Sequence, residues 1–178
     1  MKWSVGFAFL GVIFLLSLFT EIDSDVTATH SSDQLVEVEI DELVITRYDD
    51  SGQRLETSEA NHAVRFEGET KTQLSQLDVS RVDKYGHRWT MSAPRGFSEI
   101  VDNNLLLDGG VMIQRDGDLT LNTDSILVDT VAQIASSSDR TRLSSERADT
   151  VASGFYLNLN EGTAELVGQV SSIYQGSQ

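Results

Sequence analysis

The sequence contains no cysteine, and this absence removes three kinds of chemistry at once. The chain can form no disulfide bond, no zinc site built on thiolates and no cysteine nucleophile. A chain of 178 residues is nevertheless long enough to bury a core without covalent cross-links. Stability must therefore come from packing and from backbone hydrogen bonds.

Basic residues are also scarce. The chain has 13 Lys and Arg against 28 Asp and Glu, and Lys2 is the only charged side chain before position 21. The remaining residues thus carry 12 basic against 28 acidic side chains, a formal charge of −16. Such a surface does not attract nucleic-acid phosphates and resists close approach to an anionic bilayer. The composition excludes nucleic acid as a partner and favours a domain that stands off the membrane.

One long uncharged run is present, at the N-terminus. Residues 3–20 (WSVGFAFLGVIFLLSLFT) would form a helix of about 27 Å, close to the thickness of a bilayer's hydrocarbon core. Lys2 precedes the run and three acidic residues follow it, so the positive-inside rule places the N-terminus in the cytoplasm. Phe19 and Ile22 stand where a cleaved signal peptide needs small residues, which favours a retained anchor.

Three segments follow from this pattern. We expect a transmembrane anchor at residues 1–20 and a flexible polar tether at 21–34, because the tether (EIDSDVTATHSSDQ) is rich in Ser, Thr and Asp. A single domain at 35–178 would lie on the non-cytoplasmic side.

Beyond the tether, apolar and polar residues alternate with a period of two. Val36, Val38 and Ile40 alternate with acidic residues, and Val44 and Tyr48 keep the same parity. This pattern is typical of β-strands, and a single proline, at position 94, leaves them uninterrupted. We predict strands at 35–48, 54–66, 74–85, 88–97, 99–115, 118–130, 132–145, 147–160 and 163–174.

A weak internal repeat accompanies the strands. The turn glycines Gly52, Gly86 and Gly117 recur at nearly even spacing, and each is followed by an apolar residue that opens a strand. Repeated hairpins without helices predict an all-β sandwich, jelly roll or short solenoid, with a slot between two sheets. Trp89 is in phase with Met91 and is predicted to be core.

Catalytic and metal-binding templates are missing. There is no G-x-S-x-G, S-x-x-K, H-E-x-x-H or P-loop motif. His30, His62 and His87 are scattered, and the segment 116–118 lacks the spaced ligands of an EF-hand. The carboxylates lie mostly on the solvent phase of the strands, so a hydrolase with paired carboxylates is a minor alternative. What remains is a binding or scaffolding module.

Four strings, in order along the chain, resemble the LptC family, the bitopic inner-membrane component of the bacterial lipopolysaccharide transport machine. They are ITRYDDSGQRL at 45–55, WTMSA at 89–93, LLLDGGVMI at 105–113 and AELVGQVSSIY at 164–174. The resemblance implies an inner-membrane protein with a periplasmic β-jelly roll, and it implies no enzymatic activity, no cofactor and no metal. It would accept lipopolysaccharide from an inner-membrane ABC transporter and pass it to the periplasmic bridge protein LptA. The chain departs from the family in its acidic first strand and in lacking a proline near Leu77.

Family positions for lipid contact correspond to Leu43, Leu74, Ala164 and Tyr174. For the last two, strand parity over 163–174 supports one shared face. The anionic exterior suits phosphorylated head groups poorly, so we expect only acyl chains inside.

Two edges are the expected docking sites. The first strand, with Val36, Val38 and Ile40, would pair with the transporter, and the last strand, with Val167 and Gln169, would pair with the bridge protein. The alternative function is a membrane-anchored periplasmic scaffold that assembles proteins without binding lipid.

Overall fold

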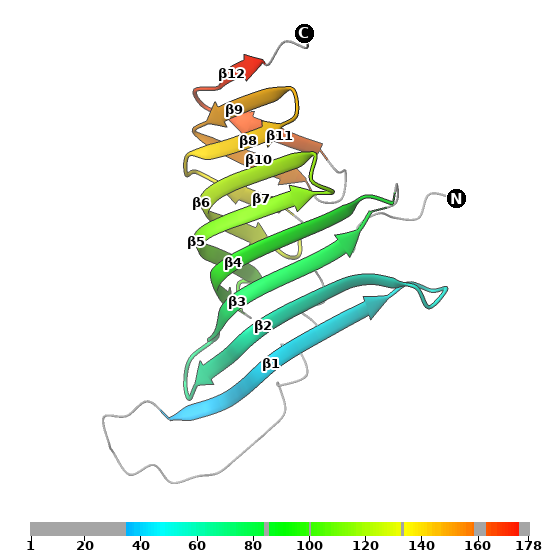
Figure 1. Ribbon diagram of the computed structural model, residues 1–178. Helices are drawn as coiled ribbons and strands as arrows, with labels where there is room; N and C mark the ends of the chain where they lie inside the picture. The colour runs from blue at the N-terminus through cyan, green and yellow to red at the C-terminus, as the bar shows by residue number, and fades with distance from the viewer. Residues whose placement is uncertain (1–34, 84–85, 100, 133, 159–162, 175–178) are drawn as a thin grey trace.

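The computed structural model describes residues 35–83, 86–99, 101–132, 134–158 and 163–174, and their regular structure is entirely antiparallel β (Figure 1). The strands are β1 (Val36–Tyr48), β2 (Arg54–Phe66), β3 (Lys71–Val82), β4 (Arg88–Glu99), β5 (Asn104–Arg115), β6 (Leu119–Asp129), β7 (Ile134–Ser137), β8 (Thr141–Ser145), β9 (Ala148–Ala152), β10 (Gly154–Asn158), β11 (Thr163–Val167) and β12 (Ser171–Tyr174). The expected anchor and tether, residues 1–34, lie outside the described residues. No helix among the described residues is long and apolar enough to cross a membrane.

The first six strands form a meander in which each strand pairs with the next. At β6 the sheet divides. Residues 119–122 of β6 pair with β8, which leads to β9 and β12, whereas residues 127–129 pair with β7, which leads to β10 and β11. The strands therefore stack from β1 to β12 in two layers, as Figure 1 shows. The prediction of an all-β jelly roll is confirmed.

A crease runs across the long strands near their midpoints. In β1, Val38 and Ile40 face the interior, and beyond the crease Leu43 and Ile45 do so. The change of phase occurs at Glu42, whose φ is +53°. A positive φ turns the chain at this residue, so the side chains before and after it alternate out of step, while β1 and β2 keep one register across it.

The same shift recurs in the neighbouring strands. Gln76 of β3 also has a φ of +53°, and the ladders of β4 and β5 change register between Ser92 and Arg95 and between Asp108 and Val111. The parity predicted across residues 41 and 42 is therefore wrong. Val44 and Tyr48 do not share the inward face, and their side chains are 59% and 60% exposed.

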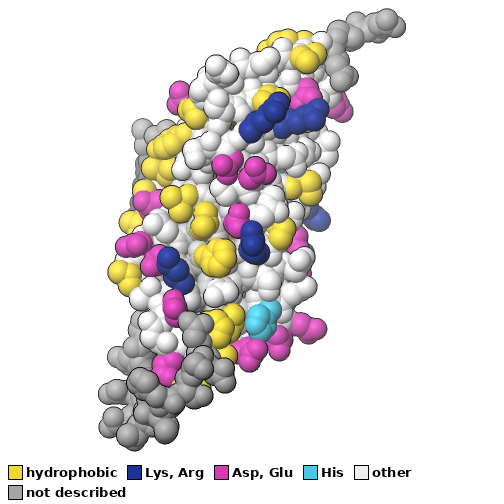
Figure 2. Space-filling view, turned by 90° about the vertical axis from the view of Figure 1, so that its left-hand side faces the viewer, with side chains coloured by type: hydrophobic (Ala, Val, Ile, Leu, Met, Phe, Trp, Pro, Cys, Tyr) yellow, Lys and Arg dark blue, Asp and Glu magenta, His cyan; other side chains and the backbone are white. Residues whose placement is uncertain are grey.

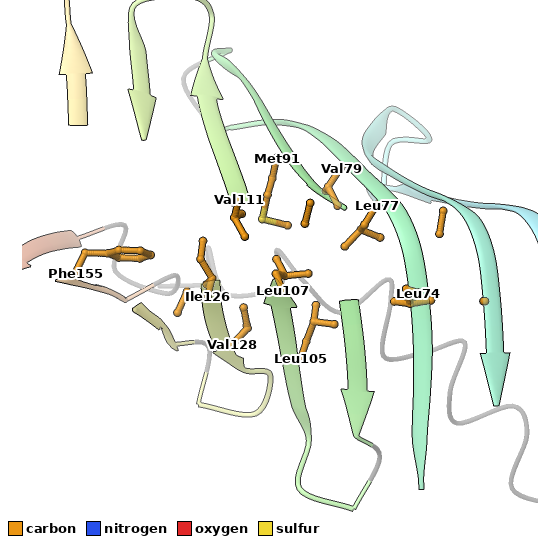
Figure 3. Close-up of a cluster of buried hydrophobic side chains, with 14 residues drawn as sticks. Leu74, Leu77, Val79, Met91, Leu105, Leu107, Val111, Ile126, Val128 and Phe155 are labelled. Carbon is orange, nitrogen blue, oxygen red and sulfur yellow. The ribbon is translucent and has the colours of Figure 1, made fainter. Parts of the chain in front are cut away.

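The core lies between the two layers. Leu107 and Ile126 are its most deeply buried large side chains, at 0% and 1% exposure. Figure 3 shows side chains of both halves of the long strands converging on one interior. The buried cluster consists of Ala60, Ala63, Leu74, Leu77, Val79, Met91, Ala93, Leu105, Leu107, Val111, Ile126, Val128, Ala135 and Phe155.

The last three predicted strands are wrong in one respect, because each is two strands. The ranges 132–145, 147–160 and 163–174 are broken where the chain passes from one layer to the other. Close backbone approach explains one of these corners, since a Cβ on Gly154 would lie 2.3 Å from the carbonyl oxygen of Ser137. Another corner is at Gly168, where φ is +81°.

The internal repeat is visible in the hairpin turns. Between β1 and β2, the N–H of Gly52 donates to the carbonyl of Asp49 at 3.0 Å. Between β3 and β4, the N–H of Gly86 donates to the carbonyl of Asp83 at the same distance. The internal repeat thus produces two hairpin turns of the same kind on the same side of the stack, where β1 and β3 end (Figure 1).

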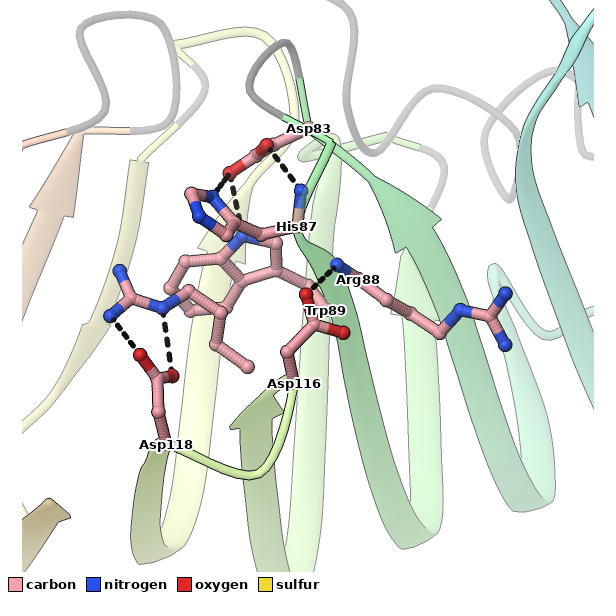
Figure 4. Close-up of polar contacts among 7 residues, drawn as sticks. Asp83, His87, Arg88, Trp89, Asp116 and Asp118 are labelled. Atoms are coloured by element: carbon pink, nitrogen blue, oxygen red, sulfur yellow. Dashed lines mark hydrogen bonds and ion pairs between the residues drawn. The ribbon is translucent and has the colours of Figure 1, made fainter. Parts of the chain in front are cut away.

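Trp89 belongs to this turn region and not to the core (Figure 4). It is only partly buried, and its indole N–H donates to Oδ2 of Asp83 at 3.1 Å. The guanidinium of Arg115 lies over its ring, 5.5 Å from the centroid, and Arg115 is itself paired with Asp118 at 2.8 Å. The expectation that Trp89 is core is wrong, because Asp83 and Arg115 offer it polar partners in this turn region.

Candidate functional site: the apolar interior and the open strand edges

The interior is lined by side chains that stand in register across the strands. Cross-strand neighbours share one face of a sheet, so a register defines a row of side chains along the stack. One row runs Ile45, Ser58, Val79, Met91, Ile113, Leu121 and Leu143. Beyond the crease a second runs Ile40, Ala63, Leu74, Gly96, Leu107 and Ile126. The apolar lining is therefore continuous from β1 to the strands that follow β6.

Leu43 and Leu74, two of the residues expected to contact lipid, lie on this lining. Leu74 is buried in the core cluster, and a Cβ on its neighbour Gly96 would lie 3.4 Å from the Cβ of Leu74. Leu43 is partly buried and packs against the cluster from β1. Leu74 thus lies inside the stack and Leu43 lies where the interior meets the first strand.

Ala164 and Tyr174 lie on two different strands, because the chain bends between β11 and β12. Ala164 pairs with Leu157 of β10, which packs against the core. Tyr174 is two residues beyond Ser172, and Ser172 is in register with Thr150 of β9.

Both residues are nevertheless on the inward phase of their strands. Thr150 pairs with Leu143, a member of the first interior row, so Ser172 and Tyr174 continue that face. Ala164 continues the opposite layer. The two residues thus flank the interior at the β11 and β12 end, where Tyr174 is 77% exposed.

The first strand has one open edge. β1 pairs only with β2 among the described strands, so its other side presents unpaired backbone groups. Its acidic residues face basic partners on β2: Glu37 pairs with Arg65 at 3.0 Å, and Asp41 with His62 at 2.8 Å. The acidic first strand is thus joined to the second by the ion pair of Glu37 with Arg65 and the hydrogen bond of Asp41 with His62.

The other end of the stack has two open edges. Within the described residues, β11 pairs only with β10 and β12 only with β9. Val167 ends β11, and its carbonyl accepts from the N–H of Ser153 at 3.1 Å. Gln169 lies in the bend, where its N–H donates to Oγ of Ser153 at 3.1 Å. The backbone donor of Gln169 is therefore used inside the domain.

Sequence reasoning missed a charged cluster at the turn end of the first strands. Nη2 of Arg47 donates to Oε2 of Glu56 at 3.1 Å, and Glu56 is in register with both Arg47 and Arg81. The Glu56 side chain is only 3% exposed. Burial raises the pKa of its carboxyl, while Arg47 and Arg81 oppose this. Burial likewise lowers the pKa of Arg81.

A signal for this cluster is present in the sequence. Arg47, Arg81 and Arg115 follow one another at equal intervals, and the interval is the same as that between Gly52 and Gly86. The registers place them in one row, Arg47, Glu56, Arg81, Trp89, Arg115 and Leu119. This row, which we call the arginine rim, borders the interior row that begins with Ile45 and Ser58.

In the described part of the chain, no group of three or more His, Asp or Glu side chains is arranged so that it could hold a metal ion. The outer face in Figure 2 mixes acidic, basic and small apolar areas. The distinctive features are thus the apolar interior, its rim and the open edges.

No match to the chain was found among curated proteins. A family model described as "Lipopolysaccharide-assembly, LptC-related" matches residues 5–175, which is nearly the whole chain. The chain therefore belongs to the LptC family, which serves lipopolysaccharide transport and is not a family of enzymes.

Proposed function

We propose that the domain holds the acyl chains of lipopolysaccharide between its two layers and moves them from the β1 end to the β11 and β12 end. In this scheme the lipid arrives from the inner-membrane ABC transporter and leaves to the periplasmic bridge protein LptA. Residues 1–20 would anchor the chain in the inner membrane with a cytoplasmic N-terminus, and the domain would lie in the periplasm. The charges that flank the apolar run support this topology.

The observation that carries the proposal is the continuous apolar lining between two strand edges that are open. Acyl chains leave water favourably only where apolar surface surrounds them, and the two interior rows offer such surface along the stack. The open backbone of β1 and of β11 or β12 can pair with strands of partner proteins and so extend the lining beyond this domain.

Lipid must displace part of the packing that fills this interior. Leu107 is 0% exposed, so acyl chains enter only if the layers move apart. The crease, with positive-φ residues in β1 and β3 and register shifts in the ladders of β5, is where the long strands bend, and further bending there would separate the layers. Small residues ease the change, because Ala60, Ala63 and Gly96 line the crease.

Site-specific photocrosslinking in cells tests the proposal. A crosslinker at Leu43 should capture lipopolysaccharide, because Leu43 packs toward the interior, and one at Val44 should not, because Val44 points outward. Ala164 and Glu165 form a second matched pair on β11. Equal capture from both members of each pair, or no capture at all, would contradict a lipid path through the interior.

The alternative, a scaffold that binds proteins and no lipid, draws on the open edges alone. Ile173 of β12 is 71% exposed, and such side chains suit strand pairing with a partner. A scaffold would co-purify with its partners while all four crosslinkers fail to capture lipid.

A further inference from the structure

In the arginine rim, Arg47 has N–H donors that lack an acceptor among the described residues. Arg47 donates to Glu56 through Nη2, whereas its Nε and Nη1 are buried and have no partner among the described residues. A buried guanidinium N–H without an acceptor is costly, because the group has lost water and gained nothing. The Nε and Nη1 groups of Arg47 would therefore gain from a further hydrogen-bond acceptor.

Charge at the rim points to an anionic acceptor. Glu56 is attracted by both Arg47 and Arg81, and Arg81 is in turn repelled by Arg47. One buried carboxylate thus stands between two cations, and Asp83 attracts Arg81 only as the weakest of its influences.

Arg47 and Arg81 lie next to the apolar interior. Ile45 and Val79 stand two residues before Arg47 and Arg81 on the same strands, which places them about 7 Å away along the strand. Arg47 and Arg81 are two strands apart, about 9.5 Å. A ligand with an apolar part in the interior and an anionic part at its end would satisfy both surfaces.

We propose that Arg47 and Arg81, held in place by Glu56, bind a phosphate of the lipid's head group at the rim while the acyl chains lie in the interior. This inference rests on the proposed function and gives the head group a definite position at the β1 end. It replaces the expectation that only acyl chains are held. Arginine suits the task because its planar N–H groups match phosphate oxygens. Arg115 continues the row but already pairs with Asp118.

The test compares two lipids on the full-length chain in uncharged detergent micelles. One is a fluorescent glycolipid of the lipid A type with its phosphates, and the other is the same lipid after enzymatic dephosphorylation. The native chain should prefer the phosphorylated lipid by about tenfold, the effect of one charge-assisted hydrogen bond. Arg81→Gln, and the paired change Arg47→Gln with Glu56→Gln, should abolish the preference and leave affinity for the dephosphorylated lipid unchanged.

The paired change avoids a buried, unpartnered carboxylate, so the fold should persist, and circular dichroism checks this. Arg142→Gln is the matched control, because Arg142 lies on β8 away from the rim and pairs with Asp149. It should keep the full preference. Inorganic phosphate in millimolar excess should leave the lipid bound, and displacement would show a site for the free anion and overturn the head-group assignment.

The experiment gives different results if phosphate does not bind at the arginine rim and if lipid does not bind in the interior. If the native chain binds both lipids equally, or if the arginine variants keep the preference, the rim does not bind phosphate while the lipid path stands. If neither lipid binds, the proposed function fails and the rim fails with it.

Discussion

Gly168 lies against Ser153 so closely that a Cβ on Gly168 would be 2.6 Å from the Cβ of Ser153. The contact joins two corners of the fold, the one between β9 and β10 and the one between β11 and β12. Ser153 also accepts the N–H of Gln169 and donates its own N–H to Val167. These contacts of Ser153 thus fix the bend between β11 and β12, the two strands with open edges at the C-terminal end.

Gly168→Ala should lower the free energy of unfolding by about 2 to 3 kcal/mol, because the new methyl clashes and the backbone has a φ of +81°. Gly52→Ala is the matched control, with the same φ and open space around it, and should cost only about 1 kcal/mol. Urea unfolding measures both. Equal losses would mean that the contact with Ser153 is absent.

Leu107→Ala should lower the free energy of unfolding by about 2 to 5 kcal/mol, because it empties the centre of the core. Leu106→Ala changes the adjacent residue, which points outward and is 38% exposed, and should cost less than about 1 kcal/mol. The comparison tests the register of β5. The opposite order would show that the strand is displaced by one residue.

Glu56 should make stability depend on pH in an unusual direction. Burial raises the pKa of Glu56 above its ordinary value of 4.5, so the folded chain holds this proton more tightly than the unfolded chain. Its contribution is therefore greatest below pH 4.5 and falls as the pH rises toward the raised pKa. The free energy of unfolding of the native chain, relative to that of Glu56→Gln, should decrease over this window.

Asp149 provides the opposite case. Its hydrogen bond from Arg142 lowers the pKa of the Asp149 carboxyl, so its contribution is present above the ordinary value of 3.8 and is lost as the pH falls through the lowered pKa. Relative to Asp149→Asn, the native chain should lose stability on acidification. Urea titrations at a series of pH values distinguish the two slopes, and slopes of one sign would contradict the assigned environments.

Proline substitutions in the open strands should distinguish which partner protein binds at each end of the stack. Val38→Pro removes a backbone donor from β1 and should weaken association with the transporter by about tenfold, leaving binding to the bridge protein unchanged. Ile173→Pro on β12 and Val167→Pro on β11 should do the reverse. Affinity measurements with both partners, on variants whose melting temperatures are first checked, give each variant its internal control.

The two C-terminal variants also test which edge would dock the bridge protein of the proposed function. Loss of binding from Ile173→Pro alone assigns β12, and loss from Val167→Pro alone assigns β11. Normal binding by both folded variants would place the docking site elsewhere on the domain. Gln169→Pro is unsuitable, because its N–H already donates to Ser153.

Much of the fold could be predicted because alternation is a local property. The range 54–66 is β2 as predicted, and the first strand differs by one residue from 35–48. Parity failed at Glu42, because a change of phase made by one residue with a positive φ leaves no pattern in the sequence. The strand breaks at Ser153 and Gly168 were missed because the chain turns there through a contact between distant residues, that of Gly168 with Ser153.

The candidate site shows the same division. Leu74, which the resemblance to the family places in contact with lipid, is buried in the core. Ala164 and Tyr174 are exposed and flank the interior on opposite layers. Arg47 and Arg81 were overlooked because an arginine on an alternating strand usually faces solvent. Only the pairing of β1, β2 and β3 shows that these arginines flank a buried carboxylate.

The amino-acid sequence by itself determined the β class, the absence of cysteine chemistry, the evenly spaced hairpin turns and membership of the LptC family. These depend on composition, local periodicity and residue order. The tertiary structure alone decided where the sheet divides at β6, which side chains line the interior and which edges stay open. The physical reason is that bulges and layer changes are set by contacts between distant residues, such as Gly168 with Ser153, which no local pattern contains.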